Sequence, residues 1–74
     1  MKIGIQLIEQ VSAKVHEAWM ESKKAKGIHS RKSEKGEELM VSYAQLSEEA
    51  KDLDRGSVKA VLEALNKVEA RETR

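Results

Sequence analysis

The 74-residue sequence contains no cysteine, no proline and no phenylalanine, and Trp19 and Tyr43 are its only large aromatic residues. Without cysteine the chain forms no disulfide framework, no cysteine-ligated zinc site and no thiol nucleophile. It also lacks the run of about 20 apolar residues that a membrane-spanning helix requires, and any apolar stretch of the signal-peptide type. These absences favour a small cytoplasmic protein that does not enter a membrane.

Charged residues are abundant and nearly balanced in sign. They make up 36% of the chain. There are 14 lysines and arginines and 13 aspartates and glutamates, which gives a net charge of +1. Such a total charge predicts neither a nucleic acid nor a membrane as partner. A chain of this size buries only about 60% of the surface that it exposes when unfolded. We therefore expect one domain over residues 1–74, with a thin core that dimerisation would extend.

The amino-terminal quarter of the chain has the apolar spacing of an amphipathic helix. From Ile5 to Ser22, apolar residues recur at separations of three and four. Lysines at 23–26 suit the negative end of a helix dipole, and Gly27 is predicted to stop the helix. The residues of the apolar face are Leu7, Ile8, Val11, Val15, Ala18 and Trp19.

A basic loop is predicted to follow. Residues 27–38 contain two glycines and two serines and have almost nothing to bury. Between Glu21 and Lys35, six lysines and arginines face two glutamates, which gives a local charge of +4. This segment is either a solvated face or a surface that attracts an anion such as phosphate.

The second half of the chain predicts a short extended segment over residues 39–43, a turn around 44–46, and a helix capped by Ser47. The helix propensity of the sequence is then interrupted near Leu53 to Ser57. This interruption predicts either a kink in one helix or a break, after which Asp54 caps a last helix. Residues 69–74 are polar and are expected to fray. The buried stripe of the last helix is predicted to be Val58, Val61, Leu62, Leu65 and Val68.

Three short motifs occur in a distinctive order. They are His-x-x-Trp at His16, Tyr-x-x-Leu-Ser at Tyr43, and Asp-Arg at Asp54. Over about residues 8–68 this order resembles the RyR domain, a small helical repeat named after ryanodine receptors and also found in bacterial and phage proteins. The chain departs from the family pattern in the connecting loop, with Ile28 in place of an aromatic residue and Gly36-Glu37-Glu38 in place of a longer stretch ending in His-Pro.

Together, pattern and resemblance predict an all-α single domain with two main helices, antiparallel or crossing, a short middle segment and a basic connecting loop. In the receptors such repeats occur in tandem as peripheral modules. The resemblance implies that a stand-alone prokaryotic or phage copy is a sensor or binding module, with a nucleotide-type ligand.

We therefore expect non-catalytic binding of a small anionic, nucleotide-like molecule. Trp19 and Tyr43 would supply stacking surfaces, with His16 beside them. Phosphate contacts would come from Lys23, Arg31 and Arg55. The alternative reading of the same residues is structural: His16 bonds a backbone carbonyl or Asp54, Tyr43 caps the core, and Arg55 pairs with Glu49 or Asp52.

Catalytic, metal and cofactor functions find no support in the sequence. No serine lies in an activating motif, and two histidines thirteen positions apart lack the spacing of a zinc site. Duplex binding is disfavoured because the chain has no recognition-helix signature. The other function class that we consider is a protein-interaction or homodimeric assembly module, with a seam formed by Ile3, Ile5, Met20 and Met40.

Overall fold

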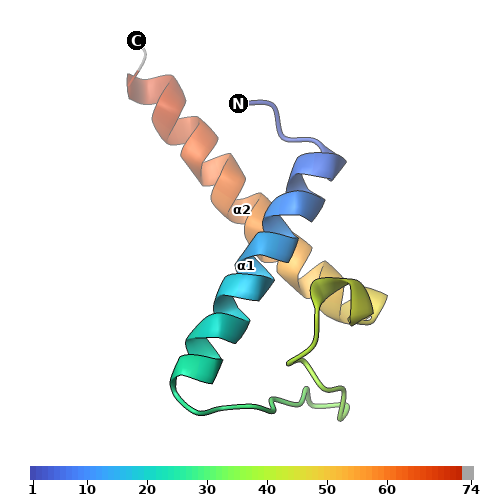
Figure 1. Cartoon of the computed structure of the whole chain (residues 1–74). Coiled ribbons are helices and arrows are strands. Elements are labelled where there is room, and N and C mark those ends of the chain that lie inside the picture. The colour runs from blue at the N-terminus through green and yellow to red at the C-terminus, as the bar shows by residue number, and fades with distance from the viewer. Residues whose placement is uncertain (73–74) are drawn as a thin grey trace.

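The computed structural model describes residues 1–72. It consists of helix α1 (Ile5–Ala25), a short 3₁₀ turn η1 (Tyr43–Gln45) and helix α2 (Glu48–Glu72). In this part of the chain there is no strand, and the loop contains a single isolated bridge, between Lys32 and Glu38. The two helices run in opposite directions and cross near their middles, and the basic loop connects them at the end opposite the chain termini (Figure 1). The predicted all-α architecture is confirmed.

Helix α1 ends at Ala25, just before the glycine that is predicted to stop it. The backbone N–H groups of Gly27 and Ile28 donate to the carbonyls of Lys24 and Lys23, at 2.9 and 3.0 Å. Gly27 has a φ of +79°, a left-handed conformation that glycine adopts without steric cost. The glycine therefore reverses the chain immediately after the lysine-rich last turn.

The most buried side chains of α1 are not those of its apolar face. Ser12 is completely buried and His16 is 5% exposed, whereas Val15 is 50% exposed. A two-helix crossing covers only the narrow strip of each helix that faces its partner. The small Ser12 side chain lies in that strip and allows close approach, so the apolar face lies at the edge of the contact.

Helix α2 begins as predicted and continues without interruption. The Ser47 hydroxyl accepts a hydrogen bond from the Ala50 N–H at 3.1 Å, which is an N-cap interaction. The helix then runs through residues 53–57, so Asp54 lies inside it and the prediction that Asp54 begins a new helix is wrong. Gly56 costs the helix about 1 kcal/mol in propensity, and packing of the buried Val58 against α1 offsets this cost.

The predicted apolar stripe of α2 is covered only in part. Val58 and Leu62 are buried, whereas Val61, Leu65 and Val68 are 59%, 51% and 50% exposed. This half of the prediction is wrong because one crossing helix shields only one strip of α2. The helix also extends through Glu72, within the segment expected to fray; residues 73–74 lie outside the described part.

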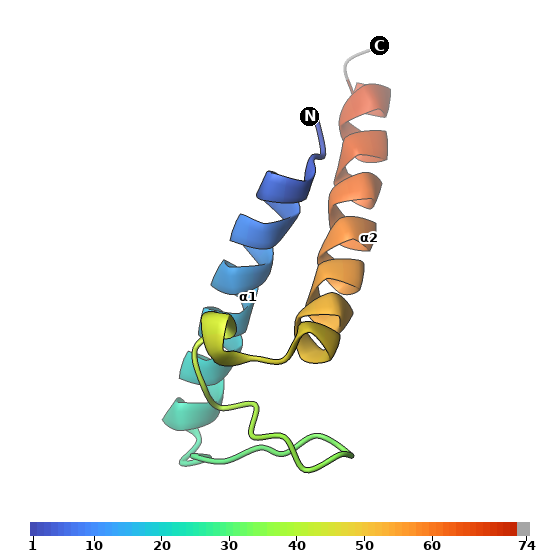
Figure 2. The same cartoon turned by 90° about the vertical axis from the view of Figure 1, so that its right-hand side faces the viewer.

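The middle segment completes a thin core. Its turn η1 packs beside α1, as Figure 2 shows from the side. Tyr43 and Leu46 from this segment join Val58 and Leu62 as the buried apolar residues of the described chain. Extents of 46 × 26 × 19 Å leave room for little more than one layer of packed side chains.

We predict that the helix crossing tolerates Ser12→Ala but not Ser12→Leu. Alanine keeps the close approach and removes a buried hydroxyl that has no hydrogen-bond partner, so stability should be unchanged or slightly higher. Leucine overpacks the contact and should lower the unfolding free energy by about 1–3 kcal/mol. Thermal unfolding followed by circular dichroism measures both. Ser22→Leu, at an exposed position of the same helix, is the matched control. Equal melting temperatures for the two leucine variants would contradict this account of the crossing.

Candidate functional site

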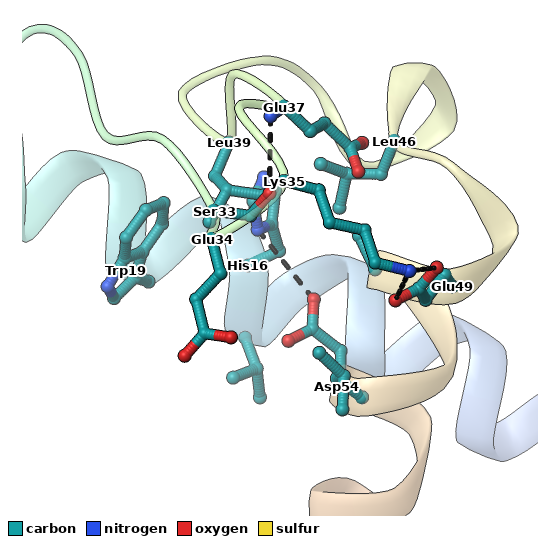
Figure 3. A pocket seen from close by; sticks show the side chains of 13 residues that line it. His16, Trp19, Ser33, Glu34, Lys35, Glu37, Leu39, Leu46, Glu49 and Asp54 are labelled. Carbon is teal, nitrogen blue, oxygen red and sulfur yellow. Dashed lines mark hydrogen bonds and ion pairs between the residues drawn. The ribbon is translucent and has the colours of Figure 1, made fainter.

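A pocket of about 570 Å³ lies between α1, the basic loop and the first turns of α2. Its apolar lining comes from both helices and from Leu39 and Leu46, and its polar lining comes mainly from the loop and α2 (Figure 3). The lining residues are Val15, His16, Trp19, Ser33, Glu34, Lys35, Glu37, Leu39, Leu46, Glu49, Ala50, Leu53 and Asp54. The volume suits a small organic molecule.

Trp19 and His16 form the α1 wall of this pocket. Three positions apart, they lie on the same side of the helix, and their rings stack with centroids 5.5 Å apart and planes inclined by 28°. His16 Nε2 lies 2.7 Å from the carbonyl oxygen of Val41, and Nδ1 lies 3.8 Å from Asp54 Oδ2. Both predicted roles of His16 are thus combined, since it bonds a backbone carbonyl and also lines the groove.

The loop that roofs the pocket is ordered by two adjacent glutamates. The Glu38 carboxylate accepts hydrogen bonds from the Ser30 hydroxyl and from the N–H groups of Arg31 (2.8 Å) and Met40 (3.1 Å). These bonds, that of Ser30 first, lower the pKa of Glu38 to about 2, because they stabilise the ionised form. Glu38 therefore closes a short hairpin in the loop, in which an antiparallel backbone bridge joins Lys32 and Glu38.

Glu37 attaches the same loop to α2. Its carboxylate accepts hydrogen bonds from the Ser47 hydroxyl (2.7 Å) and the Ser47 N–H (2.8 Å), which lower its pKa. The N–H of Glu37 in turn donates to the Ser33 hydroxyl at 3.2 Å. Lys35 adds an ion pair with Glu49, at 2.9 Å. The loop therefore has fixed contacts with the first turn of α2.

The pocket lining is acidic although the loop as a whole is basic. Of the charged residues around the pocket only Lys35 is a lysine or arginine, and Glu49 neutralises it. Three carboxylates of the lining, those of Glu34, Glu37 and Asp54, form no such ion pair with a lysine or arginine among residues 1–72. In the view of Figure 3 the Glu34 carboxylate lies between the Trp19 ring and Asp54. A ligand inside this pocket meets negative charge.

The structure brings two of the six predicted ligand residues, His16 and Trp19, into the pocket wall. Tyr43 lies behind His16, with ring centroids 6.3 Å apart, and is only 7% exposed, so it does not line the pocket. Burial, and then the Glu9 carboxylate, raise the pKa of Tyr43. Tyr43 thus has the position expected of a core cap, with His16 between it and the pocket.

Arg55 does not line the pocket, and carboxylate groups take up the hydrogen-bond donors of its side chain. Its guanidinium binds both carboxylate oxygens of Glu9, at 2.7 and 3.1 Å, and also contacts Glu48 and Asp52. The predicted pairing with Asp52 is confirmed, while Glu49 pairs with Lys35 instead. The hydrogen bond from Arg55 lowers the pKa of Glu9, so this bidentate pair fastens α1 to α2.

Lys23 and Arg31 lie outside the pocket lining. Lys23 follows Trp19 by one helical turn on the same side of α1, and Arg31 is an exposed loop residue. The sequence indicated Asp54 only as an alternative partner of His16, and it did not indicate that Glu34 would share the pocket with Trp19.

The family comparison agrees with this architecture. The model of the RyR domain family matches residues 4–73, nearly the whole chain. The chain belongs to the RyR domain family. Neither the comparison with curated proteins nor that with solved structures found a match for this RyR domain.

Two further features of this RyR domain bear on its chemistry. Neither helix, over the described residues, is long and apolar enough to cross a bilayer. Residues 1–72 also contain no cluster of three or more histidine, aspartate or glutamate side chains placed to hold a metal ion.

We predict that the loop over the pocket of the RyR domain loosens as Glu38 is protonated. Because its pKa is lowered to about 2, its contribution is complete above the ordinary value near 4.5 and is lost as the pH falls toward 2. At neutral pH, Glu38→Ala should reproduce the effect and speed exchange of the Arg31 and Met40 amide protons about tenfold or more. Hydrogen exchange by NMR measures this, with Glu34→Ala as the control. Unchanged exchange in Glu38→Ala would show that other contacts hold the loop.

Proposed function

We propose that this RyR domain is a non-catalytic binding module that senses or sequesters a small, nucleotide-like molecule. The observation that carries the proposal is the pocket of about 570 Å³ with a stacked Trp19–His16 pair on its wall. Pockets of this size enclose most of a small ligand, and an exposed indole face binds planar rings by stacking, worth about 1–3 kcal/mol per nucleobase. A cytoplasmic prokaryotic or phage protein is the setting that we propose for this role.

The charges around the pocket favour one orientation of such a ligand. The carboxylates of Glu34 and Asp54 oppose a phosphate inside the pocket, so the planar ring enters and the anionic part stays outside. Lys23, one turn beyond Trp19, is the cation best placed to meet it, and Arg31 is a second one on the loop. Arg55 has no part in this arrangement because its donors are taken by Glu9, Glu48 and Asp52.

Intrinsic fluorescence tests the proposal directly, because Trp19 is the only tryptophan in the chain. We expect adenosine and adenosine monophosphate to quench or shift Trp19 emission and to raise the melting temperature. Lys23→Ala should weaken binding of the monophosphate by about 2- to 5-fold at low salt and leave adenosine binding unchanged. Lys14→Ala removes an exposed lysine from another side of α1 and serves as the matched control. If no nucleoside or nucleotide changes the emission, the proposal is wrong.

A second candidate function rests on the exposed face of α2. Val61, Leu65 and Val68 follow each other at helical spacing and are each at least half exposed. Clustered exposed aliphatic residues are typical of interaction surfaces. This face replaces the predicted seam as the basis for a homodimeric or assembly module, since Met20 and Met40 are partly covered within the monomer and Ile5 lies on the other helix.

The assembly candidate predicts that Leu65→Lys abolishes self-association without unfolding the monomer. For a dimer stabilised through this face, the melting temperature should rise by roughly 10 °C over a ~100-fold increase in protein concentration. The variant should melt at one temperature throughout that range, while Glu63→Lys, on another side of α2, should behave as the unsubstituted chain does. Light scattering supplies the mass. A monomeric mass at all concentrations would refute this candidate.

A further inference from the structure

The His16 ring has a fixed orientation and a defined tautomer. Its Nε2 atom lies 2.7 Å from the Val41 carbonyl oxygen, and a carbonyl can only accept a hydrogen bond. Nε2 therefore carries the proton, and in the neutral ring Nδ1 presents a lone pair. The ring is 5% exposed and stacks on Trp19, so it keeps this orientation at the pocket wall.

The lone pair of Nδ1 faces another acceptor. Asp54 Oδ2 lies 3.8 Å from Nδ1, beyond normal hydrogen-bond distance, and an ionised carboxylate has no proton to donate. Both groups line the pocket, so the place where they meet presents two acceptors to a ligand. An N–H group of a ligand could donate hydrogen bonds to both acceptors, His16 Nδ1 and Asp54 Oδ2. A second proton on the His16 ring would instead place a donor between them without any ligand.

The surroundings of Asp54 strengthen the need for an outside donor. Its side chain is 35% exposed, and burial raises its pKa, which means that the carboxylate has lost part of its hydration. Glu34 adds a further carboxylate to the same pocket, and the one lysine in the lining is bound to Glu49. No lysine or arginine of the described chain reaches Asp54 as an ion-pair partner.

We propose that the pocket selects aromatic ring ligands that carry an amino group, which donates to Asp54 Oδ2 and His16 Nδ1 while the ring stacks on Trp19. The inference rests on the proposed function, since it assigns the chemical group that the same pocket recognises. It concerns the ring and not the phosphate, and it therefore stands apart from the contribution of Lys23.

Two pairs of nucleosides that differ by a single amino group test the inference. Adenosine against purine riboside removes the 6-amino group, and guanosine against inosine removes the 2-amino group. Titrations followed by Trp19 fluorescence and by calorimetry should show at least ~10-fold tighter binding of the amino member in one of these pairs, as expected for a hydrogen bond to a charged acceptor. Asp54→Ala should reduce that preference to about twofold or less and leave the des-amino member unaffected. Glu63→Ala, on the same helix outside the pocket, should retain the preference.

The possible outcomes are distinct. Equal affinity within both pairs, or a preference that survives Asp54→Ala, would overturn the inference and leave ring binding intact. Absence of binding by all four nucleosides would overturn the proposed function as well. The nitrogen chemical shifts of His16, assigned with a His29→Gln variant, give an independent check. A ring protonated on both nitrogens at neutral pH would overturn the inference, because the acceptor that it requires would be absent.

Discussion

The hydrogen bond from His16 to the Val41 carbonyl is the interaction on which the rest of this structure depends. It joins the middle of α1 to the segment before η1, 25 residues further along the chain. Because the Nε2 atom is fixed by this hydrogen bond, the ring also has a fixed position relative to Trp19, Tyr43 and Asp54. With four buried apolar residues in the part of the chain that the structure describes, the domain has little packing with which to fix such a segment. One buried polar contact therefore positions the core cap and the pocket wall together.

Much of the fold could be predicted from local signals. The spacing of apolar residues in α1, the glycine at position 27 and the Ser47 cap each act within a few residues, and each is found where the sequence indicates. The RyR resemblance, drawn from three short motifs, is likewise confirmed by the family match. Prediction from local sequence signals fails where contacts between distant segments determine the structure. The dense packing at the crossing makes Ser12 the most buried residue, and Val58 packs well enough to keep α2 continuous past Gly56.

The candidate site was less accessible from the sequence, because its residues come from three separate segments. Trp19 and His16 could be recognised as neighbours on one helix. Asp54 could be named only as one of two alternative partners of His16, since its position requires knowing that α2 is unbroken and crosses α1 at that point. Charge counting was also misleading: the segment from 21 to 35 is strongly basic, yet of its six cations only Lys35 lines the pocket, where it pairs with Glu49, and Glu34 lines the pocket as well. Sequence-averaged charge carries no information about which side of a loop each charge occupies.

The placement of the chain ends has a practical consequence. Met1 contacts Asn66 and Glu69 near the far end of α2, whereas residues of the loop and of the first turns of α2 line the pocket. Figure 1 shows the amino terminus and the loop at opposite ends of a body that is 46 Å long. A tether attached at the amino terminus, or beyond the last turn of α2, leaves the molecule at the end opposite the loop that borders the pocket. The domain can therefore be immobilised on a sensor chip, or fused to a reporter, with its mouth open to solution.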